Sequence, residues 1–156
     1  MKLIIKNLSM TYVKHQIQED IITPVFGNEF EPGYYLSSSG NATYTSSYSV
    51  STKVRLSNPI NVDGYSRLRI ENLVSRNNQY SAVFSFFKNN NDFTSASNVE
   101  YTENQAQMSN GYPAEELFTS EFEITPDMKY LLVTNGTYSS GGYVQTTLPT
   151  FTLIKD

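Results

Sequence analysis

The chain has no cysteine, no tryptophan and one histidine among its 156 residues. Without cysteine it has no disulfide framework, no thiolate zinc site and no thiol nucleophile. The single histidine excludes a histidine-rich metal site. His15 has only Glu19 near it in sequence to orient it, which is not enough for a catalytic triad. We therefore expect a protein that is not an enzyme and that uses neither a metal nor a cofactor.

Long hydrophobic runs and strong charge are also missing. The longest apolar run near the start is Leu3-Ile4-Ile5, which is too short for the core of a signal peptide. No stretch approaches the roughly 20 apolar residues of a membrane-spanning helix. Charged residues make up 17%, and the formal net charge is −4. This composition disfavours a coiled coil, a disordered polyelectrolyte and non-specific binding to nucleic acid.

Residues typical of strands and turns are abundant instead, with 12 tyrosines, 9 phenylalanines and many serines, threonines and asparagines. Leu68 and Ile70 alternate with Arg67 and Arg69, which marks a strand with one buried and one solvated face. Similar period-two runs occupy residues 48–56, 80–86 and 118–124, and residues 151–153 form a last strand. Residues 130–133 are apolar on both faces and predict a central strand.

Turn signals such as Asp63-Gly64 and Thr125-Pro126-Asp127 separate these runs. About eight short strands between such turns indicate an antiparallel β-sandwich without a substantial helix. The alternation also predicts which side chains form the core: Val50, Val54, Leu56, Leu68, Ile70, Phe84, Phe86, Phe122, Leu132 and Phe151. Two segments are expected to be long loops, residues 37–47 and residues 97–117, and loops of that length are usually functional or mobile.

The chain is long enough for one domain, with a distinct lead segment at residues 1–32 and a body at residues 33–156. The first half of the lead segment is basic and apolar. Residues 8–12 alternate as in a strand, whereas Val13, Ile17 and Ile21 recur at helical spacing, so both conformations stay open. The segment either packs on its own domain as an extra strand or reaches a neighbouring subunit as an arm. As an arm, its anchoring residues are Leu3, Ile5, Leu8, Met10, Val13 and Ile17.

Charge is unevenly distributed along the chain. All four arginines lie between Arg55 and Arg76, and only acids occur between Lys88 and Lys129. A solvated face with solvated loops is the favoured interpretation, because surface charges rarely need a partner. The alternative is a bipolar subunit whose basic patch meets an acidic patch on a neighbouring copy.

Two acidic patterns are candidates for a chemical site. Glu121 and Glu123 share a strand face about 7 Å apart, a spacing compatible with the carboxylate pair of a glycosidase. Acids on a solvated strand are common, however, and they also blunt edge pairing. Asn89-Asn90-Asn91-Asp92 offers oxygen ligands, but a calcium loop gathers more carboxylates, so a plain hairpin turn is favoured.

Tyrosines in or beside polar loops are the remaining candidates for ligand contact. Next to serine and asparagine, a tyrosine ring can stack on a sugar while its neighbours bond the hydroxyl groups. The same composition suits a protein–protein contact, and it also suits a rim that packs over the ends of the sandwich. The candidate ligand or glycan contacts are Tyr44, Tyr48, Tyr112, Tyr138 and Tyr143.

Three segments resemble small jelly-roll modules of phage tail fibres, baseplates and capsid decoration, some of which are similar to carbohydrate-binding modules. Residues 32–70 open with Pro-Gly-Tyr-Tyr, continue through a Ser/Asn loop and end after Asp-Gly-Tyr. Residues 82–97, AVFSFFKNNNDFTSAS, resemble the aromatic strand and polar hairpin of these modules. Residues 122–134, FEITPDMKYLLVT, resemble their Ile-Pro-x-x-Ala-Lys-Tyr strand. The matching motifs are structural rather than catalytic.

The resemblance implies an all-β, jelly-roll β-sandwich with a short N-terminal arm. It also implies a non-enzymatic virion protein that decorates the capsid or tail and is anchored through residues 1–32. Its expected partners are other virion proteins and further copies of itself, with no nucleic acid. Its expected location is the virion, after synthesis in the host cytoplasm without a signal peptide. The alternative is a glycan-binding adhesin that recognises the host surface. Such modules are often appended to larger chains, whereas here the module is nearly the whole sequence.

Overall fold

The computed structural model describes residues 16–47, 51, 54–74, 82–103, 117–135, 137–139, 142–144 and 148–156. Nearly all the regular structure of these residues is antiparallel β-strand, so the prediction of an all-β chain built from antiparallel sheets is confirmed. The strands are β1 (Gln18–Ile22), β2 (Tyr34–Leu36), β3 (Ala42–Tyr44), β4 (Arg55–Leu56), β5 (Ile60–Asn61), β6 (Arg67–Val74), β7 (Phe84–Phe87), β8 (Val99–Glu103), β9 (Leu117–Glu123), β10 (Tyr130–Asn135), β11 (Thr137–Ser139), β12 (Gly142–Val144) and β13 (Thr150–Lys155). One 3-10 helix, η1 (Ala96–Asn98), precedes β8.

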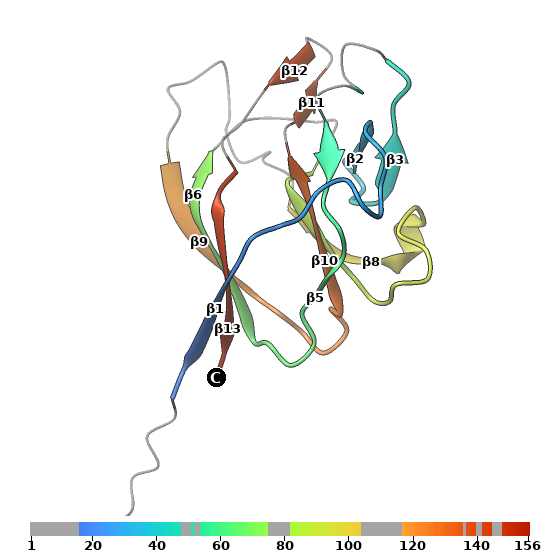
Figure 1. The fold of residues 1–156 in the computed structure, drawn as a ribbon. Coiled ribbons are helices and arrows are strands. Elements are labelled where there is room, and N and C mark those ends of the chain that lie inside the picture. The colour runs from blue at the N-terminus through green and yellow to red at the C-terminus, as the bar shows by residue number, and fades with distance from the viewer. Residues whose placement is uncertain are drawn as a thin grey trace, which may run out of the picture.

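Two sheets form the sandwich (Figure 1). The four-stranded sheet has the order β1-β13-β6-β9, so strands from the two ends of the sequence lie side by side. The five-stranded sheet has the order β4-β10-β7-β8, and β5 pairs with β10 beyond the end of β4. β10 therefore lies between other strands on both sides, as its apolar sequence predicted.

The main core lies between these two sheets. It includes Leu68 and Ile70 from β6, Phe151 from β13, and Phe84 and Phe86 from β7, all with no exposed surface. Phe122, also predicted for the core, is half-buried and packs against this cluster. The alternation on β6 is confirmed, since both arginines of that strand are on the opposite face from Leu68 and Ile70.

A second apolar cluster covers the other face of the five-stranded sheet. It joins Leu36 of β2 and Ala42 of β3 to Leu56, Phe87 and Leu132 of the sheet. The β2–β3 hairpin thus forms a third layer, which Figure 1 shows to the right of β10. Leu36 N donates a hydrogen bond of 3.0 Å to Thr134 Oγ1, so a buried contact also links this layer to β10.

This third layer corrects the expected pattern of β7. The sequence predicted that Phe84 and Phe86 alternate with residues on a solvated face. Ser85 and Phe87 are buried as well, because the hairpin covers the face that was expected to meet water, whereas Val83 is buried in the main core.

Both predicted long loops contain strands. Residues 37–47 include β3, which pairs with β2 and buries Ala42. Residues 97–117 include β8, which pairs with β7, while residues 104–116 lie outside the described residues. Of the predicted strand at residues 48–56, the structure describes residues 51 and 54–56. Arg55 and Leu56 form β4, and Val50 lies outside the described residues.

The lead segment joins the four-stranded sheet. Residues 18–22 form β1, which pairs along its whole length with β13, from Gln18 opposite Lys155 to Ile22 opposite Phe151. Ile21 therefore lies in a strand. The helix that the spacing of Ile17 and Ile21 allowed does not form there. Residues 1–15 lie outside the described residues. Within the described part of the chain, no helix is long and apolar enough to cross a membrane.

Candidate functional site

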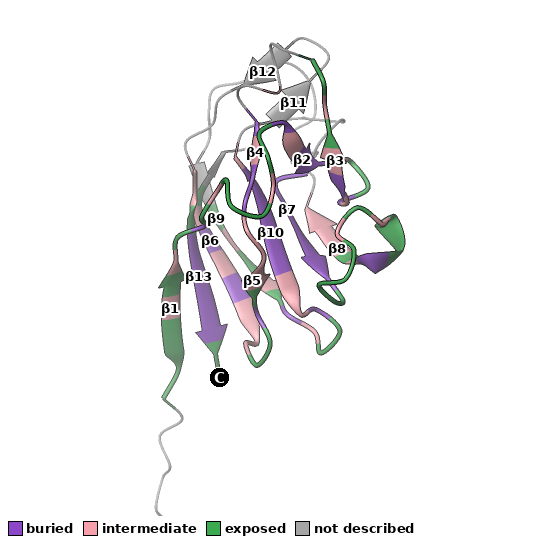
Figure 2. Ribbon diagram, turned by 45° about the vertical axis from the view of Figure 1, so that its right-hand side comes forward, coloured by how far each residue is buried: buried purple, intermediate pink, exposed green. Residues whose placement is uncertain are grey.

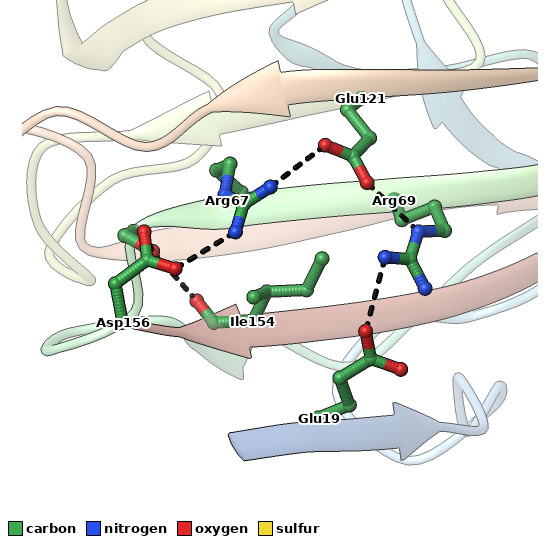
Figure 3. Close-up of polar contacts among 7 residues, drawn as sticks. Glu19, Arg67, Arg69, Glu121, Ile154 and Asp156 are labelled. Atoms are coloured by element: carbon green, nitrogen blue, oxygen red, sulfur yellow. Dashed lines mark hydrogen bonds and ion pairs between the residues drawn. The ribbon is translucent and has the colours of Figure 1, made fainter. Parts of the chain in front are cut away.

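Charged side chains form a continuous ladder across the outer face of the four-stranded sheet (Figure 3). Glu121 of β9 accepts hydrogen bonds from both arginines of β6, 2.9 Å from Arg67 Nη1 and 2.8 Å from Arg69 Nε. Arg69 Nη2 also donates to Glu19 of β1 at 3.0 Å, and Arg67 Nη2 donates to Asp156 at 2.7 Å. The ladder connects the two edge strands of the sheet with the last residue of the chain.

Two side chains beneath the ladder are buried although they are on the outer face. Ile154 and Thr152 alternate with the inward-facing Leu153 and Phe151, yet they are only 0% and 3% exposed. Ile154 lies opposite Arg67, whose aliphatic stem can cover apolar surface while its charged head stays in water. The ladder therefore covers the outward-facing side chains of β13, and it also pairs opposite charges.

The ladder also shifts the ionisation of its members. Hydrogen bonds from Arg69 and then Arg67 lower the pKa of Glu121. The pKa of Arg69 is raised mainly by its hydrogen bond to Glu121, and that of Arg67 mainly by its hydrogen bond to Asp156. Glu121 is thus held ionised, which is the opposite of what a general acid needs.

This environment bears on two interpretations of the sequence. Glu121 and Glu123 do share the exposed face of β9, but Glu121 is committed to two guanidinium groups. Arg67 and Arg69 are paired with acids of their own chain, so they do not form a free basic patch for a neighbour.

The outward face of β1 and its flanks carries a row of exposed apolar side chains. Ile17, Ile21 and Val25 are 58%, 74% and 54% exposed. On the inner side of the same strand, Asp20 Oδ2 accepts a hydrogen bond of 2.6 Å from the hydroxyl of Tyr65. Figure 2 shows β1 as an exposed strand beside the buried β13.

Of the predicted anchoring residues, the structure describes Ile17, which is exposed immediately before β1. The others lie outside the described residues: Leu3, Ile5, Leu8, Met10 and Val13.

Aromatic rings form a second surface feature around the β2–β3 hairpin. Tyr44 is 48% exposed, and its ring centroid lies 5.4 Å from that of Tyr34. Tyr34 contacts Phe30 at 5.4 Å, and Phe30 contacts Phe93 at 6.2 Å. Tyr44 is thus the exposed end of a row of rings that leads to the second core.

Gly33 allows Tyr44 to approach the backbone. Its φ of +105° lies in the left-handed region, and a Cβ there would come 2.8 Å from the Tyr44 ring. The backbone N–H of Thr45 donates to the Gly33 carbonyl at 3.1 Å, which holds β3 against the Pro32-Gly33 turn.

The structure does not bring the predicted tyrosines together as one described site. Tyr138 of β11 lies opposite Tyr143 of β12 in a separate two-stranded hairpin. Tyr48 and Tyr112 lie outside the described residues. Of the predicted tyrosines, Tyr44 alone has a described side chain.

The polar turn after β7 is organised by its own side chains. Asp92 Oδ1 accepts hydrogen bonds from both the backbone and the hydroxyl of Thr94. Asn98, 6% exposed, donates to the carbonyls of Asn89 and Asp92 and accepts from the Asn89 N–H. Sequence reasoning missed Asn98, because nothing distinguishes it from the other asparagines of this segment.

Groups of histidine, aspartate and glutamate arranged to hold a metal ion are not found among the described residues. His15 lies outside them.

Comparisons with known proteins add no assignment. No protein-family model matches the chain, and neither a curated protein nor a solved structure matches it significantly.

Proposed function

We propose that this protein is a non-enzymatic structural subunit of a phage particle, which decorates the capsid or tail and is held there by its N-terminal segment. The observation that carries the proposal is the position of β1. The lead segment enters the sandwich at the edge of a sheet, through the exposed residues 16 and 17. Ile22 and Phe30 of the lead segment pack against the two cores, so the proposed contact with another subunit is assigned to the residues before β1.

The composition of residues 1–15 supports this role. Leu3, Ile5, Leu8, Met10 and Val13 are apolar and recur among lysines. Such a segment gains free energy when its apolar side chains are buried against a partner. The jelly-roll topology and the phage setting rest on the resemblance of about residues 32–156 to virion modules. The proposed partners are other virion proteins and further copies of the chain, and the proposed location is the virion.

Incorporation into particles tests this proposal. Purified particles from an infection in which the gene is present should contain the chain at many copies by quantitative mass spectrometry. Particles produced after deletion of the gene should lack it, and adding the purified protein should restore it. A chain that stays in the cell lysate and never co-purifies with particles would contradict the proposal.

A glycan-binding adhesin is the second candidate, and the exposure of Tyr44 is the observation that favours it. Nearly half of this side chain is open to solvent, so part of its ring is available for stacking. On a glycan array, the adhesin predicts selective binding that Tyr44→Ala abolishes and Tyr44→Phe largely retains, because stacking needs the ring. Uniform absence of binding would leave the structural role as the better account.

A further inference from the structure

The lead segment joins the sandwich at one particular end of the molecule. Gln16 and Ile17 are exposed just before β1, and β1 begins beside the end of β13, with Gln18 opposite Lys155. β6 begins and β9 ends at the same end, as their registers with β13 and with each other require. Figure 1 shows these points together at the lower end of the molecule. We call this surface the entry end, formed by residues 16–18, 62–66, 124–129 and 155–156.

Polar contacts connect the parts of the entry end. Lys129 Nζ donates a hydrogen bond of 2.7 Å to Asp63 Oδ1, which joins the turn after β9 to the turn before β6. The hydroxyl of Tyr65 donates to Asp20 at 2.6 Å and so joins that second turn to β1. The side chains of Asp63 and Asp127 are exposed on the two turns. The entry end is therefore one connected surface, to which β1 is fixed.

The proposed anchor is close to this surface along the chain. Val13 is the last proposed anchoring residue before Ile17, and five residue steps separate it from Gln18. An extended chain spans at most about 3.3–3.6 Å per residue, so the Cα atoms of Val13 and Gln18 are at most roughly 18 Å apart. β1 is paired along its whole length with β13, so its first residue cannot swing away from the entry end. A bound lead segment therefore holds this end next to its partner.

The chemistry of the entry end suits a protein interface. Such interfaces have an apolar centre and a polar rim. Ile17, which is 58% exposed, continues the apolar side chains of the lead segment onto the sandwich. Around it, Asp63, Asp127 and Lys155 are exposed charges of both signs. The apolar centre would come from the lead segment with Ile17, and the rim from the two turns and the end of β13.

We propose that the entry end is the surface of the sandwich that docks on the partner of the lead segment. That partner is a virion protein that binds the apolar segment and presents a polar surface of mixed charge around it. This docking rests on the proposed function and specifies which surface of the sandwich meets the particle.

The opposite end of the sandwich then faces away from the particle. The N–H of Thr45 bonds to the carbonyl of Gly33, and the N–H of Gly33 bonds to the carbonyl of Val54, next to β4. β4 pairs with the last residues of β10, whereas the turn of the entry end leads into the first residue of that strand, Tyr130. The exposed Tyr44 and the residues after it therefore lie far from the entry end.

Single cysteines can test this orientation, because the chain has no cysteine of its own. Asp127→Cys places a thiol on the entry end, and Ser46→Cys places the matched control after β3; both positions are exposed. Each full chain is labelled with a maleimide when free and when sedimented with particles that lack the protein. Asp127→Cys should react at least about tenfold more slowly on the particles, because an interface excludes solvent, whereas Ser46→Cys should keep its rate.

Each outcome bears on the proposal. Equal slowing of both cysteines, or slowing of Ser46→Cys alone, would overturn the docking of the entry end. The same holds if neither cysteine is slowed on the particles. If Asp127→Cys no longer sediments but keeps the wild-type melting temperature, while Ser46→Cys sediments normally, the substitution has disrupted the docked surface and the proposal is supported.

The same experiment separates this proposal from the proposed function. A wild-type chain that sediments with particles while Asp127→Cys and Ser46→Cys keep their rates leaves the virion role intact and rejects the docking surface. A wild-type chain that does not sediment rejects the virion role and the docking surface together.

Discussion

Tyr65 donates a hydrogen bond of 2.6 Å to Asp20 and so ties the edge strand β1 to the segment that precedes β6, 45 residues away in sequence. Gln18 donates to the same carboxylate at 3.0 Å. The hydrogen bonds from Tyr65 and then Gln18 lower the pKa of Asp20, and its carboxylate raises the pKa of Tyr65. With the inner side of β1 held in this way, Ile21 is directed outward on the opposite side of the strand.

Acidification should destabilise the protein by protonating Glu121. Its folded pKa is lowered, so its stabilising contribution is complete above its ordinary value of 4.5 and is lost as the pH falls through the folded pKa. We expect the melting temperature of Glu121→Gln to depend less on pH below 4.5 than that of wild type. Glu123→Gln is the matched control on the same strand face, because Glu123 forms no ion pair with a described residue. Identical pH profiles for wild type and Glu121→Gln would contradict the ladder.

Ile154 should behave as a core residue although it is on the outer face of its sheet. Ile154→Ala removes a side chain with no exposed surface and should lower the free energy of unfolding by about 2–5 kcal/mol. Ile21→Ala on the same face of the sheet, where the side chain is 74% exposed, should change it little. Chemical denaturation of both variants measures the difference, and equal losses would mean that the ladder does not bury Ile154.

Thr134 should be essential to the junction between β2 and β10. Thr134→Val keeps the shape of the side chain but leaves the buried N–H of Leu36 without its acceptor, at a cost of about 1–3 kcal/mol. Thr134→Ser retains the hydroxyl and should recover most of that loss. Denaturant titration decides the matter, and a valine variant as stable as the serine variant would show that the hydrogen bond is unimportant.

Gly33 should be needed for the position of Tyr44. Gly33→Ala combines the strain of a positive φ with a contact of 2.8 Å between the new Cβ and the Tyr44 ring. Gly27→Ala has a similar φ of +97° but open space around the added Cβ, so it isolates the backbone strain. We expect Gly33→Ala to lower the melting temperature more than Gly27→Ala and to shift the Tyr44 ring resonances in NMR spectra. Equal effects would mean that the ring does not pack on this glycine.

The sequence predicted best where one face of a strand meets water. On β6 the alternation of Leu68 and Ile70 with arginines correctly predicted which side chains are buried, because the inner face is packed and the outer face is solvated. The same alternation did not predict the burial of Phe87 on β7, because the β2–β3 hairpin covers the second face of that strand. The loop that joins β2 to β3 is polar, and Ala42 is too small an apolar residue to stand out as a buried contact of β3.

The charge ladder could not be predicted from the sequence. Glu19, Arg69 and Glu121 meet only because β1, β6 and β9 share a sheet with one particular register. Pairings between residues so far apart depend on topology, which local alternation does not determine. The same limit explains why Ile154 could not be recognised as buried.

The central claim is that the N-terminal segment attaches a folded sandwich to a particle, and removal of residues 1–15 tests it most directly. The truncation keeps β1 and its contacts with β13, so the β-rich circular dichroism spectrum and the melting temperature should be unchanged. Co-sedimentation with particles that lack the protein is the measurement. The account predicts that the full chain sediments with the particles and that the truncated chain stays in the supernatant. Equal sedimentation of both chains, or unfolding of the truncated chain, would contradict the claim.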